Sequence, residues 1–470
     1  MCCAWFDEFS QSQADCADAQ GFAAAHQTFA ARRCEQLAKA VVRRRYELLP
    51  LDVGAERDQH TARFAEMARD AAIALHAQHH SDDPHSGKRV SFGLIRMANI
   101  EQLVEVALAL YQLGAPDGVQ IHLCVYHSQF PLLIRSGIER QLDQALNRRQ
   151  RDAVFDLPDI RQRLDAHRQA DQLFIVLGSP VTEVGRDHDY DWAVVEPSSM
   201  RSLIQLAGRI RRHREGECST PNLRVFDTNL RHFREPGQSA FCRPGFETAA
   251  SPLDTHNLQQ LLPMVENGVI DARPRIAAPP GPLQPRARLV DLEHARMAKE
   301  MLVQKSAAAL PAAMPGVRQR PSAQAGATPP LNAASWWHLP PADALLTAVL
   351  PQQQPFRLDT MERVDLVLRP NEDEDDYELV QLMDKSDGRR GETPFVPVEK
   401  SQNHRIDDTA VQGHGISIWG ESDYWQALTA LAAELDMPLA DCARRFGTVT
   451  LPKYDNGWCF HPALGFTKYR

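Results

Sequence analysis

Short apolar runs alternate with longer stretches of helical periodicity through the middle of the chain. The apolar runs are RVSFGLIR (89–96), VQIHLCVY (119–126), LFIVLG (173–178), WAVVE (192–196) and LRVFD (223–227). Helical patterns lie between them, near 99–113, 130–149, 158–170 and 199–213. Continuous apolar strands joined by helical crossovers are typical of a parallel sheet covered by helices on both faces. The pattern therefore predicts an α/β lobe at residues 81–236.

The segments that precede and follow this lobe have other patterns. Residues 1–80 are mainly helical, and Phe22 and Phe29 recur there in a polar background. Residues 237–335 are rich in proline and alanine and contain one helical pattern, Leu289 to Val303. Pro-rich sequence cannot build a core of its own. We therefore expect a helical segment before the lobe and a linker with an accessory helix after it.

Residues 336–470 have a mixed pattern. Short β-like runs at 363–368 and 415–419 accompany a helical pattern near 423–446 and several aromatic residues. A segment of this length with both kinds of element can form its own core. We therefore expect a small mixed α/β C-terminal domain.

Composition and charge narrow the class of protein. Of the 470 residues, 43% are hydrophobic and 24% are charged, as in ordinary globular proteins. No apolar run approaches the roughly 18 residues of a membrane span, and the start MCCAWFDEF does not resemble a secretory signal. We therefore expect a cytoplasmic protein without a membrane role. The nine cysteines form no CxxC pair, and the net charge of −9 argues against a uniformly basic nucleic-acid-binding protein.

The stretch PSSMRSLIQLAGRIRRHR (197–214) is the most informative part of the sequence. Ser198 and Ser199 are favourable N-caps for a helix near 199–213. At helical spacing, one side of this helix carries three apolar residues, Leu203, Ala207 and Ile210. The opposite side carries a glutamine, a glycine and two arginines, Gln205, Gly208, Arg209 and Arg212.

Two guanidinium groups three residues apart on a helix can hold phosphoryl oxygens and stabilise transition-state charge. Gly208 would let a ligand approach the backbone closely. The alternative is a solvent-exposed helix face that is rich in arginine. That alternative accounts for the arginines but not for Gln205 and Gly208 on the same face, so we favour a phosphate-binding interpretation.

These residues resemble the Q-x-x-G-R-x-x-R sixth motif of superfamily 2 helicases. In that family the glutamine and the arginines of the motif face a nucleotide across the cleft between two RecA-like lobes. The resemblance implies a catalytic role for three residues, Gln205, Arg209 and Arg212. The last arginine of the motif usually acts as an arginine finger, and it corresponds to Arg212 here.

The stretch SPVTEVGRDHDYDWAVVEPSS (179–199) resembles the fifth motif of the same helicases, which links nucleotide and nucleic acid. The two resemblances together imply an ATP-binding set of Gly185, Asp187 and Gly208. They also place Thr182 and Glu183 near nucleic acid. Taken alone, 179–199 would fit an acidic turn between two strands better than a functional motif; the sixth motif beside it favours the functional interpretation.

The combined stretch 183–214 is similar to the interference helicase–nuclease of type I-F CRISPR systems, which a guide-RNA surveillance complex recruits to foreign DNA. Other stretches agree with this similarity: AWFDEF (4–9), SFGLIRMANI (91–100), YHSQFPLLIRSGIERQL (126–142) and WWHLPPADALLTAVLPQQQPFR (336–357). The resemblance implies a second RecA-like helicase lobe with a C-terminal domain. Its implied partners are single-stranded DNA and the surveillance complex, with the adaptation integrase and a separately encoded first lobe as further candidates.

The sequence departs from this family in its phosphate-binding motifs. It has no G-x-x-x-x-G-K-[ST] motif, because HSGKRVSF (85–92) has Arg89 where a serine or threonine must reach the magnesium ion. The pair His188-Asp189 fits a loop better than the dyad of an HD nuclease, so we expect no metal site. ATP and Mg²⁺ are therefore expected as cofactors only together with the missing first lobe. The chain alone is expected to be inactive as an ATPase.

The resemblance also suggests that five residues lie near the DNA strand on the lobe surface: Arg96, Asn99, His127, Ser128 and Arg135. Contacts of this kind go to phosphate and sugar, and they weaken with salt. Arg135 could equally pair with Glu139 along its own helix. The rival to a motor part is a non-catalytic fragment of a split or truncated gene, which binds DNA or protein without turnover.

Overall fold

The computed structural model describes residues 2–7, 10–183, 185–262, 268–277, 281–302, 361–382 and 395–469. The chain divides into two compact units, which are described separately. The larger comprises Val41–Ala272 and Met361–Arg470, and the smaller comprises Met1–Ala40 and Arg273–Thr360. The Pro-rich stretch 307–334 and the stretch 336–357 used in the family resemblance lie outside the described residues.

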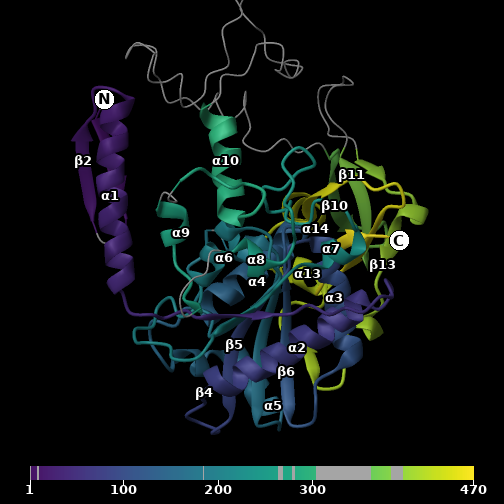
Figure 1. The fold of residues 1–470 in the computed structure, drawn as a ribbon. Coiled ribbons are helices and arrows are strands. Elements are labelled where there is room, and N and C mark those ends of the chain that lie inside the picture. Colours follow the sequence, from purple (N-terminus) through teal and green to yellow (C-terminus); the bar gives the residue numbers. More distant parts are fainter. Residues whose placement is uncertain are drawn as a thin grey trace, which may run out of the picture. The chain divides into compact units, whose positions relative to one another are not determined.

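An eight-stranded sheet runs through the larger unit (Figure 1). Seven strands lie in the order β14-β6-β7-β5-β8-β9-β3, and a short β4 pairs with β5. The bounds are β3 (Tyr46–Leu49), β4 (Ser81–Asp82), β5 (Arg89–Arg96), β6 (Val119–Tyr126), β7 (Asp171–Gly178), β8 (Trp192–Val195), β9 (Leu223–Phe226) and β14 (Ile416–Ile418). The seven strands pair parallel, while β4 pairs antiparallel. The predicted parallel α/β lobe is thus confirmed.

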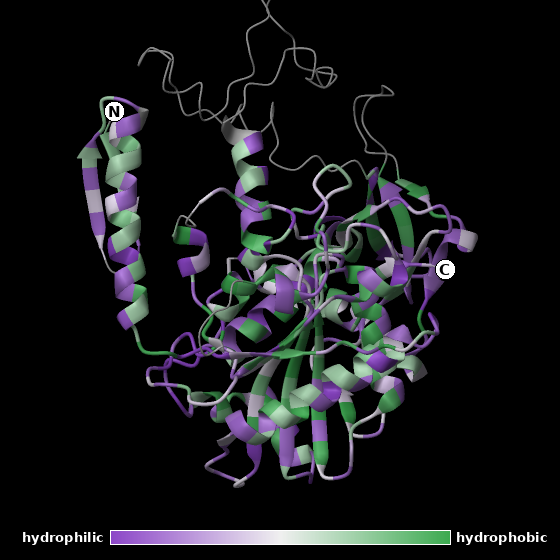
Figure 2. Cartoon of the chain, viewed as in Figure 1, coloured by the Kyte–Doolittle hydropathy of each residue, from purple (hydrophilic) through white to green (hydrophobic). Residues whose placement is uncertain are grey.

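The central strands are buried on both faces. All eight residues of β6 are buried, and so are seven residues each of β5 and β7. Figure 2 shows these strands as predominantly hydrophobic. Close packing across the sheet requires a glycine at one point, because a Cβ at Gly93 would lie 2.1 Å from the ring of Trp192. The indole N–H of Trp192 donates to Ser91 Oγ at 3.0 Å, so the ring keeps a partner inside the core.

Helices connect and cover these strands. Their bounds are α2 (His60–His79), α3 (Ile100–Leu113), α4 (Leu132–Ala145), α5 (Pro158–Ala166), α6 (Met200–Ala207), α7 (Leu230–Arg234) and α8 (Leu258–Leu261), with short 3₁₀ turns η1 (Ala153–Asp156) and η2 (Pro180–Thr182). Helix α2 packs against α3 and against β5 and β8, while α4 packs against β6. The crossover helices predicted from the sequence are therefore present.

Besides the short β4, two of the seven parallel strands were not assigned to the sheet from the sequence. Strand β3 lies within residues 1–80, which were expected to be helical. Strand β14 corresponds to the predicted run 415–419, but it pairs with β6 instead of staying within the C-terminal part. Next to it, the indole N–H of Trp419 donates to Asp159 at 3.0 Å. The division of the chain into four parts remains a prediction.

The rest of the C-terminal part forms two small sheets. One is antiparallel, in the order β12-β11-β10-β15, and the other has the order β13-β16-β17. The bounds are β10 (Arg363–Pro370), β11 (Tyr377–Leu382), β12 (Phe395–Pro397), β13 (Asn403–Arg405), β15 (Thr448–Pro452), β16 (Trp458–His461) and β17 (Gly465–Lys468), with α13 (Tyr424–Glu434), α14 (Leu439–Phe446), η6 (Lys400–Gln402) and η7 (Asp408–Val411). A small mixed α/β C-terminal domain is thus confirmed.

In the smaller unit, the residues that the structure describes form a hairpin and three helices. The bounds are β1 (Cys2–Phe6), β2 (Gln11–Asp15), α1 (Ala19–Lys39), α9 (Arg273–Ile276) and α10 (Leu289–Leu302). The helix predicted from Leu289 is confirmed as α10, with Val303 outside the described residues. Trp5 of the hairpin stacks on Phe22 of α1, with ring centroids 5.6 Å apart. Among the residues described, no helix is long and apolar enough to cross a membrane.

Candidate phosphate-binding loop and nucleic-acid groove

Helix α6 ends before the two arginines that were expected on its face. The side chain of Ser199 caps its N-terminus, as predicted, and its last residue is Ala207. The predicted helix near 199–213 is therefore too long. Arg209 and Arg212 lie in the loop that follows, so the expectation of two guanidinium groups on one rigid helix face is wrong.

A contact distant in sequence ends the helix. Ile210 forms a parallel bridge with Tyr190. Tyr190 N donates to Arg209 O at 2.9 Å, and Arg211 N donates to Tyr190 O at 3.0 Å. These hydrogen bonds take the place of helical ones, and Arg211 adopts a left-handed conformation with φ +48°. We call residues 208–214 the arginine loop.

Buried ion pairs hold the arginine loop in place. Asp189 accepts the main-chain N–H of Arg212 at 3.0 Å and Nη2 of Arg214 at 2.7 Å. Arg214 also pairs with Asp191, and Nη1 of Arg148 lies 3.4 Å from the same carboxylate. Asp189, Asp191 and Arg148 are all buried. We call these buried ion pairs the frame of the arginine loop. The sequence analysis did not predict them, although the alternating aspartates of DHDYD (187–191) pointed to buried charge.

Arg212 has an anionic partner within the same loop cluster. Its Nε lies 2.5 Å from Oδ1 of Asp187. The same carboxylate pairs with Arg149, and Nε2 of His213 lies 3.2 Å from it. The hydrogen bond from Arg212 and the nearby imidazole of His213 hold the pKa of Asp187 well below its usual range. Asp187 is therefore a carboxylate over the whole physiological pH range.

Arg209 is bound to a neutral group instead. Its Nε and Nη2 donate to the main-chain carbonyl oxygen of Glu183, at 3.2 and 2.9 Å. Beneath the loop, Arg44 Nε donates to Ile210 O at 2.9 Å. Burial and the charge of Arg212 lower the pKa of Arg209, and burial with neighbouring arginines lowers the pKa of Arg44 to about 10. Positive charge is therefore crowded around this loop.

The residues predicted to bind ATP are brought together only in part. Asp187 meets Arg212, as described. Gln205 is half-buried in the last turn of α6, and Gly208 caps that helix. A Cβ at Gly208 would lie 3.2 Å from Gln205 O, so the position is tight. Gly185 is exposed with φ +74°. The assignment of these residues to ATP stays a prediction.

Three residues expected near nucleic acid are buried. Arg96 is 1% exposed, and its Nε lies 2.7 Å from Oε1 of Glu183. Its other donors reach Glu196 O at 2.6 Å and Ser198 Oγ at 2.7 Å. Thr182 is also buried. The expected surface position of Arg96 is therefore wrong, because a carboxylate distant in sequence takes its guanidinium into the core. Thr182 and Glu183 lie in the expected loop but face inward.

His127 is buried as well. Its Nε2 donates to Leu464 O at 2.8 Å, and its Nδ1 accepts the main-chain N–H of Gln129 at 3.1 Å. Burial lowers the pKa of His127 to about 4, so the ring is neutral and links β6 to the C-terminal part. Its expected surface position is wrong. Asn99 is half-buried at the start of α3, with its amide 3.5 Å from Gln102 Oε1.

The two remaining residues, Ser128 and Arg135, line one groove. It has a volume of about 540 Å³ and is completed by polar side chains of the C-terminal part, among them Arg363, Asp365, Thr448 and Thr450. Arg135 Nε lies 3.7 Å from Oε1 of Glu139, so the alternative pairing along α4 is also present. The hydroxyl and guanidinium groups of this lining are of the kind that binds phosphate and sugar. We call this cavity the polar groove.

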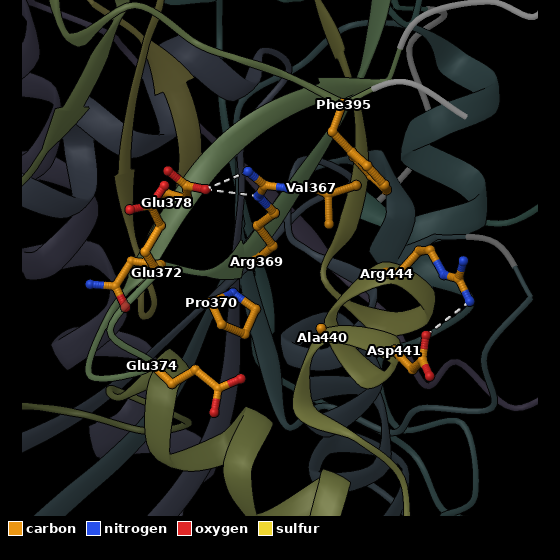
Figure 3. Close-up of a pocket in the computed structure, with 11 residues that line it drawn as sticks. Val367, Arg369, Pro370, Glu372, Glu374, Glu378, Phe395, Ala440, Asp441 and Arg444 are labelled. Carbon is orange, nitrogen blue, oxygen red and sulfur yellow. Dashed lines mark hydrogen bonds and ion pairs between the residues drawn. The ribbon is translucent and has the colours of Figure 1, made fainter. Parts of the chain in front are cut away.

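A second cavity in the C-terminal part is lined by more acidic than basic side chains (Figure 3). Its volume is about 380 Å³, and its charged lining residues are Arg369, Arg444, Glu372, Glu374, Glu378 and Asp441. Arg369 Nε donates to Glu378 at 2.8 Å, and Arg444 Nη2 donates to Asp441 at 3.0 Å. Because carboxylates neutralise both arginines and two more acids remain, this cavity is unsuited to phosphate.

The His188-Asp189 pair is engaged in the loop and does not form part of a metal-ligand cluster. His188 Nε2 lies 3.0 Å from Asp143, and Asp189 belongs to the frame of the arginine loop. Within the described ranges, no group of three or more His, Cys, Asp or Glu side chains is arranged to hold a metal ion. The placement of this pair in a loop between strands agrees with the prediction.

Family models and curated proteins match the chain over both parts of the larger unit. A model described as CRISPR-associated nuclease/helicase Cas3, C-terminal, matches residues 89–215. Another, CRISPR-associated Cas3 subtype I-F/YPEST-like, C-terminal domain, matches residues 368–468. The chain is 43% identical over 99% of its length to CRISPR-associated nuclease/helicase Cas3 subtype I-F/YPEST of Pseudomonas aeruginosa, and 36% identical to its counterpart in Pectobacterium atrosepticum. It spans 40% of the length of each relative.

Solved structures also match, at low similarity. The crystal structure of T. fusca Cas3 with AMPPNP shares 18% identity and a TM-score of 0.27, over 41% of this chain and 19% of that chain. A TM-score this low adds nothing to the family relationship. The parallel sheet with its crossover helices and the small C-terminal domain fit a RecA-like lobe with an appended domain. The chain belongs to the Cas3 family of subtype I-F/YPEST, whose C-terminal regions the two models describe.

Proposed function

We propose that this chain is the C-terminal motor part of an ATP-dependent DNA helicase/nuclease that acts in type I-F CRISPR interference against foreign DNA. The arginine loop is the observation that carries the proposal. Its two candidate phosphate-binding arginines stand on a backbone fixed by buried Asp189 and Asp191. Rigid placement of guanidinium groups is what stabilisation of a phosphoryl-transfer transition state requires. The names of the curated relatives, nuclease/helicase, agree with this class of activity.

In this proposal the cofactors are ATP and Mg²⁺, and the residues that hold the phosphates and the metal lie on the other motor lobe. Arg212 acts as the arginine finger and Arg209 as the second phosphate ligand. Such an arginine contributes about 10³-fold or more to turnover. Gln205 and Gly208 form the adjoining wall of the site, and Gly185 with Asp187 form the loop opposite. The nuclease centre lies outside this chain.

The polar groove is the proposed path of single-stranded DNA. Ser128, Arg135 and the facing Arg363 supply donors for phosphate and sugar oxygens, without any pattern that would read a base sequence. Asn99 is proposed as a further contact. The other proposed partners are the guide-RNA surveillance complex, the adaptation integrase and a separately encoded first lobe, and the proposed location is the cytoplasm.

A chimera tests the proposal. In it, this chain replaces the matching region of the Pseudomonas aeruginosa relative. ATP hydrolysis is measured with and without single-stranded DNA, for the chimera and for the chain alone. We expect DNA-stimulated hydrolysis by the chimera and none by the chain alone. Hydrolysis by the chain alone contradicts the proposed division of the site. A folded chimera that binds DNA without hydrolysis favours the rival, a binding fragment without turnover.

A further inference from the structure

Three donors from two segments of the chain converge on the carboxylate of Asp187. Arg212 reaches Oδ1 at 2.5 Å, and Arg149, from the loop after α4, pairs with Oδ2. His213 Nε2 lies 3.2 Å from Oδ1. Two guanidinium groups with an imidazole nearby form the kind of donor set that binds phosphate as well as carboxylate. Arg149 was not among the residues predicted from the sequence.

The imidazole of His213 is oriented as a donor toward this anion. Its Nδ1 accepts the main-chain N–H of Arg148 at 3.2 Å, so the ring carries its proton on Nε2. The His213 side chain is 5% exposed, and Nε2 has no aligned hydrogen-bond acceptor within the described part of the chain. A buried donor without an aligned partner is costly. It can donate to an acceptor that is better aligned than Asp187, which already lies within 3.2 Å.

The charge balance around Asp187 favours an additional anion. The neighbouring carboxylates of Asp189 and Asp191 are already matched by Arg214 and Arg148. Arg186, on the same loop as Asp187, pairs with Glu139 and Asp143. Asp187 is thus left to balance Arg149 and Arg212. Arg209 donates to a carbonyl oxygen and forms no ion pair within the described part of the chain. Two guanidinium groups therefore share one carboxylate, and a third lies nearby without one.

An incoming anion can reach Arg149 from solvent, because its side chain is 63% exposed. Arg149 also lines a cavity of about 450 Å³ with polar side chains (Gln144, Asn147, Gln150) and apolar ones (Ala153, Val154, Leu157), but Asp187 and Arg212 do not line it. An exposed ion pair such as Arg149–Asp187 contributes little to stability, because water screens both partners. Stability alone therefore does not explain why Arg149 shares the carboxylate of Asp187 with Arg212, the candidate arginine finger.

We propose that Arg149 is a third phosphate-binding arginine, and that Asp187 occupies in this structure the place of a terminal phosphate of the nucleotide. Arriving phosphate displaces the carboxylate and takes over the donors of Arg149, Arg212 and His213. Asp187 thereby keeps the finger ordered and competes with weakly bound anions. This inference rests on the proposed function, because it assigns the ligand of the same loop.

Phosphate binding by the purified full chain tests the inference. Inorganic tripolyphosphate is titrated at low salt by calorimetry into wild type, Arg149→Gln, Arg212→Gln and Asp187→Asn. Arg151→Gln is the matched control, since Arg151 is an exposed arginine two residues along. Arg149→Lys keeps the charge and shows whether a point charge suffices. Thermal unfolding of each variant verifies that it is folded.

We expect Arg149→Gln and Arg212→Gln each to raise the dissociation constant about tenfold, the scale of one charge-assisted hydrogen bond. Arg149→Lys should recover part of the loss, Arg151→Gln should equal wild type, and Asp187→Asn should bind more tightly. The inference is overturned if wild type does not bind tripolyphosphate, if Arg149→Gln matches Arg151→Gln, or if Asp187→Asn binds no better than wild type.

The two proposals can fail separately. If the chimera needs Arg212 for ATP hydrolysis but the full chain binds tripolyphosphate independently of Arg149, the motor assignment stands and the third arginine does not. If tripolyphosphate binding depends on Arg149 but the chimera is inactive, the anion site stands and the motor assignment fails.

Discussion

The side chain of Arg209 is hydrogen-bonded to the main chain of Glu183. Its Nε and Nη2 both donate to the carbonyl oxygen of the glutamate, at 3.2 and 2.9 Å. The side chain of Glu183 is at the same time buried against Arg96. The position of one candidate phosphate ligand thus depends on a buried ion pair at the end of β5. Two stretches that resemble separate helicase motifs are coupled by this residue.

The buried pair predicts a large loss of stability when it is broken. Arg96→Ala leaves the carboxylate of Glu183 buried and unpaired, so the free energy of unfolding should fall by about 3–5 kcal/mol in a urea titration. The matched control is Arg63→Ala, which breaks an exposed pair with Glu66 on α2 and should cost less than about 1 kcal/mol. Equal effects of the two substitutions would show that the pair is not buried in solution.

The contact between Gly93 and Trp192 predicts a steric effect. Gly93→Ala places a methyl group against an indole ring 2.1 Å away in the buried part of β5, so either the ring or the strand must move. We expect a loss of about 1–3 kcal/mol in the free energy of unfolding. Gly137→Ala is the control, because nothing lies within 4 Å of a Cβ there and helix propensity should make it stabilising. A neutral Gly93→Ala would contradict the packing.

His127 predicts a dependence of stability on pH. Its pKa is lowered from 6.5 to about 4 in the folded chain, so the unfolded chain binds more protons between these values. Stability should therefore fall as the pH decreases from about 6.5 toward 4, and His127 should contribute on the order of 2 kcal/mol of that fall by pH 5.

Urea titrations at pH 7 and pH 5 measure this contribution. His127→Gln should reduce the difference between the two pH values, whereas the exposed His85→Gln should leave it unchanged. If His127→Gln shows the full wild-type difference, the buried neutral histidine is not its source.

The polar groove predicts a loss of DNA affinity with a reduced salt dependence. Arg135→Ala and Arg363→Ala each remove one phosphate contact, so the slope of log affinity against log salt should fall by about 0.7 for single-stranded DNA. Arg140→Ala is the matched control, because Arg140 is exposed on the same helix, α4. Fluorescence anisotropy over a range of salt concentrations measures both quantities. Equal slopes for Arg135→Ala and Arg140→Ala would exclude the groove as the DNA path.

Much of the parallel sheet could be predicted because its central strands are continuous apolar runs. Strands β3 and β14 could not be assigned to the sheet from the sequence. They have only four and three residues, which is too short to show a hydrophobic period, and the strands with which they pair lie far away in the sequence. The helix at α6 was predicted too long because Leu203, Ala207 and Ile210 keep helical spacing. Only the bridge from Tyr190 ends it, and that contact has no local signal.

The candidate site shows the same limit. A resemblance of motifs pointed to Arg209 and Arg212 and to the loop around Asp187, and the structure places Arg212 and Asp187 in contact. The resemblance could not show that Arg96 and His127 are buried, because their partners Glu183 and Leu464 lie 87 and 337 residues away. Burial of polar side chains depends on tertiary partners, which motif spacing does not contain.

The central claim is that this chain supplies the arginine finger of an ATP site shared with another motor lobe. The most direct measurement is the rate of ATP hydrolysis stimulated by single-stranded DNA in the chimera, compared between wild type, Arg212→Ala and the exposed control Arg201→Ala on α6. We expect Arg212→Ala to lower kcat about 10³-fold and Arg201→Ala to stay near wild type. Turnover by Arg212→Ala within about twofold of wild type would contradict the central claim.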